Sequence, residues 1–96
     1  MSPENKKKLS KLRKKLDNLD NSLLILIKKR TEIVKNVLKL KKFKKEIVDK
    51  KRIKTILKNI KKKSLKRNID PKITQRIWYN MILSYIDFEK RNFKKK

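Results

Sequence analysis

The first forty residues carry a regular pattern of apolar positions. Apolar side chains recur at alternating steps of three and four residues, at Leu9, Leu12, Leu16, Leu19, Leu23, Leu26, Ile33, Val37 and Leu40. This spacing is a heptad seam, which is typical of one long helix that packs against other helices. Ser2 and Pro3 supply an N-cap and a first helical residue, so we expect this helix to run from there to about Lys41.

Two shorter amphipathic segments follow. Residues 42–48 have weaker periodicity and predict a loop or a frayed helix end. Asp49 is suited to cap a second helix. The apolar positions of that helix are Ile53, Ile56, Leu57, Ile60 and either Ser64 or Leu65. After the polar connector 66–68, Asp70 and Pro71 are suited to start a third helix.

The third helix is expected to end in a basic tail at about residues 91–96. Its apolar positions are Ile73, Ile77, Trp78, Met81, Ile82, Tyr85 and Ile86. No strand pattern or internal repeat is visible. The predicted fold class is therefore all-α, with one long helix plus two shorter helices.

Length and composition exclude several kinds of site. The 96 residues allow a single domain, 1–96, with a modest core, and a chain of this size often gains core by forming a homodimer. Cys, His and Gly are absent, which excludes disulfides, thiol nucleophiles, histidine chemistry and glycine-rich phosphate loops, and we expect no metal site. No apolar run reaches about 18 residues and no signal-peptide pattern opens the chain, so we expect a cytoplasmic protein without membrane contact.

The net charge of +24 suggests a nucleic-acid partner. The chain also lacks Ala and is rich in Lys, Ile and Asn, a composition that AT-biased codon usage would give whatever the function. Aromatic residues are few and show no interleaved stacking pattern. A basic nucleic-acid-binding helical module therefore stays a less favoured alternative, with salt-sensitive and sequence-indifferent binding expected from the charge alone.

The seam has one break, because Arg30 stands where an apolar residue is expected. A desolvated arginine requires an anionic partner, which is either an acid from another helix or a ligand. Lys41 lies 11 residues further on, on the same helix face and roughly 16 Å away. These two cations could bracket a small anion. Arg13 lies about 100° around the helix from Arg30, so it suits a pocket on a partner chain.

Two further residues are candidates for the same site. Arg52 lies in the first turn of the second helix, near N–H groups that favour anions. Glu89 lies on the apolar stripe of the third helix, where burial favours the protonated acid and makes it a hydrogen-bond donor. Each candidate also has a plainer interpretation. Considered one at a time, three of the cations are ordinary surface residues, namely Lys41, Arg13 and Arg52. Glu89 would then be a solvated acid near the chain end, and Ile53 and Tyr85 would be core residues.

The combined spacing resembles the all-helical AroQ-type chorismate mutases over about residues 9–90. The residues that carry the resemblance are Leu12-Arg13-x-x-Leu16-Asp17-x-Leu19-Asp20-x-x-Leu23-Leu24, then Arg30, Lys41, Asp49-x-x-Arg52, Asp70-Pro71, Ile77-Trp78 and Glu89. The resemblance implies an intertwined homodimer whose first helices span both subunits, with two identical sites.

The resemblance also implies a role for each candidate. Arg30, Lys41 and Arg52 would come from one chain and Arg13 from the other, with the arginines holding the two carboxylates of chorismate. Lys41 would donate to the ether oxygen, and Glu89, when protonated, would be a second donor. Asp49, Ile53 and Tyr85 would also line the substrate site. The rearrangement to prephenate is unimolecular, so it requires no cofactor and no covalent intermediate.

Three features depart from the mutase pattern. Ile53 stands where many mutases carry a Glu that binds the substrate hydroxyl, and Tyr85 stands where Ser is common. The segment between Lys41 and Arg52 is one residue shorter than in some mutases. All three features resemble the related isochorismate pyruvate lyases, which form salicylate on the same fold, although Glu89 departs from the Gln expected there. We lead with the mutase and keep the lyase and a non-catalytic relative as alternatives.

Overall fold

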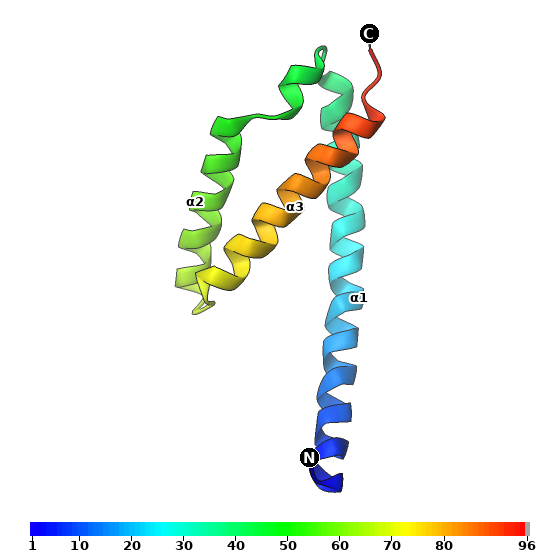
Figure 1. Cartoon of the computed structure of the whole chain (residues 1–96), viewed down its shortest axis with the longest axis vertical. Helices are drawn as coiled ribbons and strands as arrows, with labels where there is room; N and C mark the ends of the chain where they lie inside the picture. The colour runs from blue at the N-terminus through cyan, green and yellow to red at the C-terminus, as the bar shows by residue number, and fades with distance from the viewer. Residues whose placement is uncertain (96) are drawn as a thin grey trace. The chain divides into compact units, whose positions relative to one another are not determined.

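The computed structural model describes residues 1–95, so Lys96, the last residue of the predicted basic tail, lies outside the described residues. The described part is helical and contains no strand (Figure 1). Its elements are α1 (Pro3–Leu40), the short 3₁₀ helix η1 (Lys44–Ile47), α2 (Lys50–Lys66) and α3 (Pro71–Asn92). The predicted fold class of one long helix plus two shorter ones is confirmed. Because α3 continues to Asn92, the predicted tail begins two residues later than expected.

The long helix α1 starts where the capping signal predicts. The hydroxyl oxygen of Ser2 accepts a hydrogen bond from the backbone N–H of Asn5, at 3.1 Å. The helix ends at Leu40, one residue before the predicted end. Most of its seam is exposed, from 43% at Val37 to 81% at Leu40. An apolar stripe of this length in contact with water marks an interaction surface.

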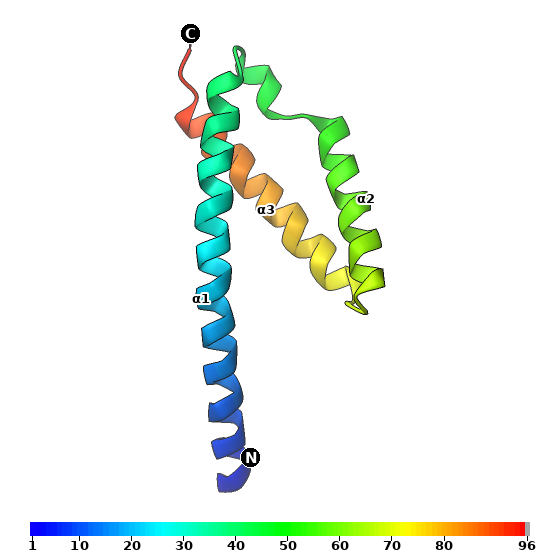
Figure 2. The ribbon, with the colours of Figure 1, turned by 180° about the vertical axis from the view of Figure 1, so that it is seen from behind.

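The chain forms two compact units, Met1–Val34 and Lys35–Lys96. Within the second unit, α2 packs against α3 and η1 also contacts α3. Figure 2 shows α2 (green) and α3 (yellow to red) running in opposite directions from a tight turn. At this turn Asn68 has a φ of 55°, and the N–H of Ile69 donates to the carbonyl of Ser64 at 2.9 Å. A right-handed helix often ends in this way, with one residue in the left-handed conformation just after its last turn. Asn adopts that conformation more readily than most residues.

The core of the second unit is small and partly polar. Leu38, Ile47 and Ile82 are its buried apolar residues, and Ser64 is buried with them. The hydroxyl of Ser64 lies 2.6 Å from that of Thr74, which joins α2 to α3. No helix in the described residues is long and apolar enough to cross a bilayer.

Not every position on the predicted apolar stripes is buried. Leu65 is 57% exposed, because Ser64 takes the position that faces α3 and the next residue points about 100° away. Ile73 and Ile77 lie on the predicted stripe of α3 but are also exposed. Conversely, Ile47 is buried, although it falls in the segment predicted as a loop or frayed end. That segment forms η1, which folds Ile47 inward.

Candidate active site

An ion pair joins the end of α1 to the last turns of α3. The Lys41 ammonium lies 2.8 Å from Glu89 Oε1, and the two side chains are 19% and 9% exposed. A buried carboxylate is costly without a partner, and Lys41 supplies both the charge and the hydrogen bond. The prediction placed Glu89 on the apolar face of its helix, and the residue is buried there. In this arrangement its carboxylate accepts a hydrogen bond from Lys41.

Lys41 also lines an open hollow of about 750 Å³. The other residues that line it are Val37, Leu40, Glu46, Val48, Asp49 and Lys50. They come from the end of α1, from η1 and from the start of α2. The hollow thus places an ammonium group and the N-terminal end of a helix around one space. Both features favour an anion.

Glu46 lines this hollow as well, although it was not predicted as a site residue. Its Oε2 accepts hydrogen bonds from the backbone N–H groups of Lys42, at 2.7 Å, and Phe43, at 2.9 Å. The pKa of the Glu46 carboxyl lies below its ordinary value, chiefly because of the hydrogen bond from the N–H of Phe43. The N–H of Lys42 and the cations of Lys45 and Lys41 lower it further. The spacing of three residues between Phe43 and Glu46 is that of a capping box, but Phe43 lacks the Ser or Thr hydroxyl that would mark one in the sequence.

The start of α2 carries three of the predicted residues. Asp49 is its N-cap, and Asp49 Oδ1 accepts a hydrogen bond from the N–H of Arg52 at 2.9 Å. The N–H of Ile53 donates to the backbone carbonyl of Asp49 at 3.0 Å. Arg52 is exposed and Ile53 is half-buried. The cap therefore fixes the first turn of α2, on which Arg52 is carried.

The remaining predicted residues lie on α1 and α3. Tyr85 is half-buried on α3, one turn before Glu89. Arg30 is half-buried on α1, and Arg13 is exposed there and lines a hollow with Leu9 and Asp17. Arg13 and Arg30 belong to the unit Met1–Val34, whereas the other predicted residues belong to the second unit. Of the predicted set, the structure brings Lys41 into contact with Glu89 and places Lys41 and Asp49 on one hollow.

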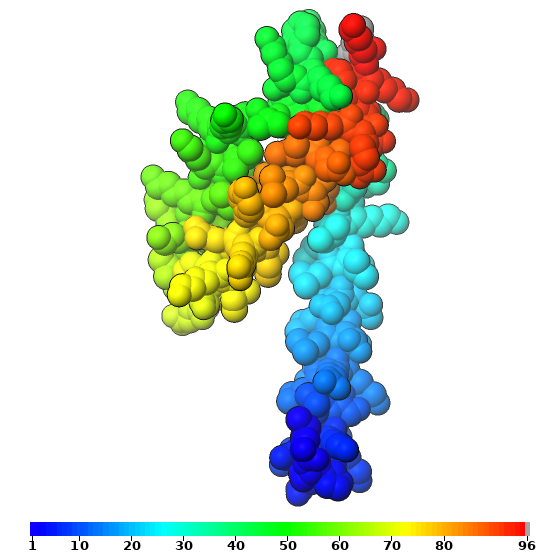
Figure 3. Space-filling view, viewed as in Figure 1, coloured from blue at the N-terminus to red at the C-terminus, as the bar shows by residue number. Residues whose placement is uncertain are grey.

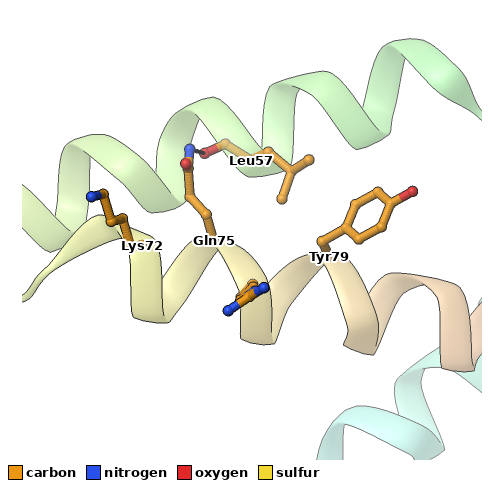
Figure 4. A pocket seen from close by; sticks show the side chains of 5 residues that line it. Leu57, Lys72, Gln75 and Tyr79 are labelled. Atoms are coloured by element: carbon orange, nitrogen blue, oxygen red, sulfur yellow. Dashed lines mark hydrogen bonds between the residues drawn. The ribbon is translucent and has the colours of Figure 1, made fainter.

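A third hollow, of about 470 Å³, lies between α2 and α3. It is lined by Leu57, Lys72, Gln75, Arg76 and Tyr79, none of which was predicted as a site residue. Figure 4 shows the Gln75 side chain reaching across to the backbone of Leu57, where its amide donates to the carbonyl at 3.4 Å. This bond ties the two helices together.

The residue types of the predicted set suit electrostatic chemistry. The candidate residues are cations, carboxyl groups, Ile53 and Tyr85, and the chain has no Cys or His to act as nucleophile or general base. Such a set can hold an anion and stabilise negative charge that develops on an oxygen.

The comparisons with known proteins agree with this chemistry. The sequence model of the family described as "Chorismate mutase type II" matches residues 12–90, which include every predicted site residue. A search of the curated proteins and a search of the solved structures found no match. Because the family match covers most of the sequence and the helical fold agrees with it, the chain belongs to the type II chorismate mutases, which are isomerases.

Proposed function

We propose that the chain catalyses the rearrangement of chorismate to prephenate, with Lys41 at the centre of its active site. The observation that carries this proposal is the 2.8 Å contact of Lys41 with the buried Glu89, beside a hollow that also reaches the N-terminus of α2. The proposed reaction breaks a C–O bond and forms a C–C bond within one molecule, so the protein supplies neither a nucleophile nor a cofactor.

Catalysis then rests on two physical effects. The site holds the flexible substrate in the reactive conformation, which removes much of the entropic barrier. It also stabilises the negative charge that grows on the ether oxygen as the C–O bond breaks. We assign this second role to the Lys41 ammonium. It has three N–H donors, and one of them is used by Glu89, which leaves two for substrate.

We assign Glu89 the role of a second donor to the ether oxygen. Only the protonated acid can donate, because an ionised carboxylate accepts hydrogen bonds but has no proton to give. In the observed contact Glu89 accepts from Lys41. Protonation of Glu89 would turn this side chain into a donor as well, so that Glu89 and Lys41 could both donate to the substrate.

We propose that the carboxylates of chorismate are held by arginines from two chains. Arg30 and Arg52 would come from one chain and Arg13 from its partner in a homodimer. Support comes from the exposed seam of α1, whose apolar side chains a second copy would cover. In this proposal residues 1–96 form a single domain, and its active site is complete only in the dimer.

Three further residues would shape the substrate site. Asp49 orients the first turn of α2 through its bond to the N–H of Arg52, which positions the arginine. Ile53 follows that arginine and Tyr85 precedes Glu89 by one helical turn. We propose that Ile53 and Tyr85 contact the ring of the substrate, where Ile53 gives no hydrogen bond to its hydroxyl.

The direct test is an assay of the purified protein with chorismate and, separately, with isochorismate. The proposal predicts formation of prephenate from chorismate. Formation of salicylate and pyruvate from isochorismate in clear excess would instead make Ile53 and Tyr85 marks of a lyase. Absence of both reactions would overturn the assignment as an enzyme.

A substitution at Lys41 tests the assigned role. Lys41→Ala should lower kcat/KM for chorismate by about 10²–10³-fold, because it removes the donor to the developing oxyanion. Lys42→Ala is the matched control, since Lys42 is an exposed neighbour whose side chain is not placed in the site, and it should stay within about twofold of wild type. Equal kcat/KM values for the two variants would rule out Lys41 as the donor.

A further inference from the structure

The positive charge is distributed unevenly over the helices of the second unit. Helix α2 carries eight lysines, one arginine and no acidic residue in 17 positions. Helix α3 is longer, yet it carries two lysines, two arginines and two acidic residues. Biased codon usage raises the lysine content of a whole gene, so it does not explain this difference between neighbouring helices. The cations of α2 therefore call for an explanation of their own.

Five of these lysines form a continuous row, here named the lysine strip, which consists of Lys51, Lys54, Lys58, Lys62 and Lys66. Their steps of three and four residues place them within an arc of about 120° on the helix. The row is about 22 Å long, at 1.5 Å per residue. It lies roughly opposite the side of α2 that packs on α3, on which Ser64 is buried.

The lysine strip is open to solvent, and no acidic side chain in the described part of the chain pairs with it. All five residues are exposed. Lys41 pairs with Glu89 and Arg91 pairs with Asp87, and neither ion pair involves the strip. Figure 3 shows side chains of α2 (green) extending away from those of α3 (yellow to orange). Adjacent lysines one turn apart repel each other, and this repulsion destabilises the folded chain. A bound polyanion would relieve the repulsion.

The form of the strip favours a nucleic-acid backbone over a lipid surface. A membrane-binding helix needs an apolar face to insert, but the apolar side of α2 packs on α3 and leaves Leu65 as its strongly exposed large apolar residue. A nucleic-acid duplex instead presents phosphates at about one per 3.4 Å of axis on each of its two strands, so about 22 Å of duplex carries about twelve, and those on the facing side can contact the strip. Lysines bind phosphates as point charges and do not read bases in the manner of a bidentate arginine.

We propose that the lysine strip is a docking surface for the phosphate backbone of double-stranded nucleic acid, bound without sequence preference. None of its residues belongs to the proposed active site, so the two functions can be separated by mutation. Each lysine–phosphate contact releases about 0.9 counterion in B-DNA. Five contacts therefore contribute about 4.5 to the slope of log K against log salt concentration.

The experiment compares two variants of the full chain that have the same net charge. In the strip variant the five lysines of the strip are replaced by Gln, which keeps helix propensity. In the control variant five exposed lysines of α1 are replaced by Gln, at Lys6, Lys7, Lys8, Lys11 and Lys15. Binding to a fluorescent 20-base-pair DNA duplex is followed by anisotropy between 50 and 200 mM NaCl. Chorismate turnover and circular dichroism report the fold of both variants.

The proposal predicts that only the strip variant changes. Between 50 and 200 mM NaCl, wild-type binding should weaken about 500-fold more than binding of the strip variant, while the control variant follows wild type. Duplexes of unrelated sequence should bind equally. Equal weakening of the two variants would overturn the proposal in favour of a general charge effect. Loss of binding to vesicles containing anionic lipid, with duplex binding unchanged in the strip variant, would assign the strip to membranes instead.

Discussion

At the scale of single residues, the pair formed by Lys41 and Glu89 links the fold to the chemistry. The Lys41 ammonium neutralises the buried Glu89 carboxylate, and the carboxylate in turn holds the ammonium in one position. The same contact holds the end of α1 near the last turns of α3. A residue pair that stabilises the unit also positions the proposed donor.

Glu89→Gln tests the second donor through the pH dependence of activity. The amide of Gln can donate at any pH, whereas the carboxyl of Glu89 can donate only while it is protonated. The ratio of variant to wild-type kcat/KM for chorismate should therefore rise as the pH rises. Rate profiles measured from pH 5 to pH 9 provide the check. A ratio that is constant with pH would mean that Glu89 does not donate to the substrate.

Glu46 gives a pH-dependent contribution to stability. Its pKa is lowered in the folded chain, first by the N–H of Phe43, so its contribution is present above the unfolded pKa and is lost as pH falls through the folded pKa. Glu46→Gln should therefore melt at a lower temperature than wild type at pH 7. The difference should shrink as the pH is lowered from 7 to 3, because the Glu46 carboxyl takes up a proton as the pH falls through its folded pKa. A difference of equal size at both pH values would contradict this origin.

The contacts among the candidate residues could not be predicted from the sequence. Lys41 and Glu89 are predicted by their positions, but their pairing depends on how η1 and α3 pack, over 48 residues of chain. Glu46 was not predicted, because its hydrogen bonds form only when the chain turns sharply after α1. Local spacing does not specify such a turn.

At the scale of elements, the starts of the helices follow from local chemistry. Ser2, Asp49 and Asp70 are predicted as N-caps, and each side chain accepts a hydrogen bond from a first-turn N–H. The donor and the acceptor of a cap lie two or three residues apart, so both can be recognised in the local sequence. Burial is different, since the choice between Ser64 and Leu65, like the burial of Ile47, depends on a neighbouring helix.

The turn between α2 and α3 offers a test of the fold that leaves the proposed site untouched. Asn68 has a left-handed backbone, which costs a residue with a Cβ free energy and costs glycine none. Asn68→Ala should lower the free energy of unfolding by about 1 kcal/mol, whereas Asn68→Gly should match or exceed wild type. Urea denaturation measures both. Equal stability of the Ala and Gly variants would contradict the left-handed turn.

At the scale of the whole molecule, the exposed seam of α1 is the feature that a single chain leaves unexplained. The sequence predicts that this helix packs on other helices, yet most of its seam leucines are in contact with water. A homodimer would cover them and would bring Arg13 of one chain to the site of the other. The apolar pattern of α1 predicts that another surface covers this helix, but it does not specify how that surface is positioned.

The most direct test of this account mixes two inactive variants. Arg13→Ala and Arg30→Ala should each lose most chorismate turnover, because each removes a carboxylate-binding cation from both sites of a homodimer. After unfolding and refolding together, about half of the dimers are mixed, and each mixed dimer has one site with both arginines intact. The account predicts recovery of about a quarter of wild-type activity. No recovery in a refolded mixture that contains mixed dimers would show that Arg13 and Arg30 act from the same chain, and would contradict the shared site.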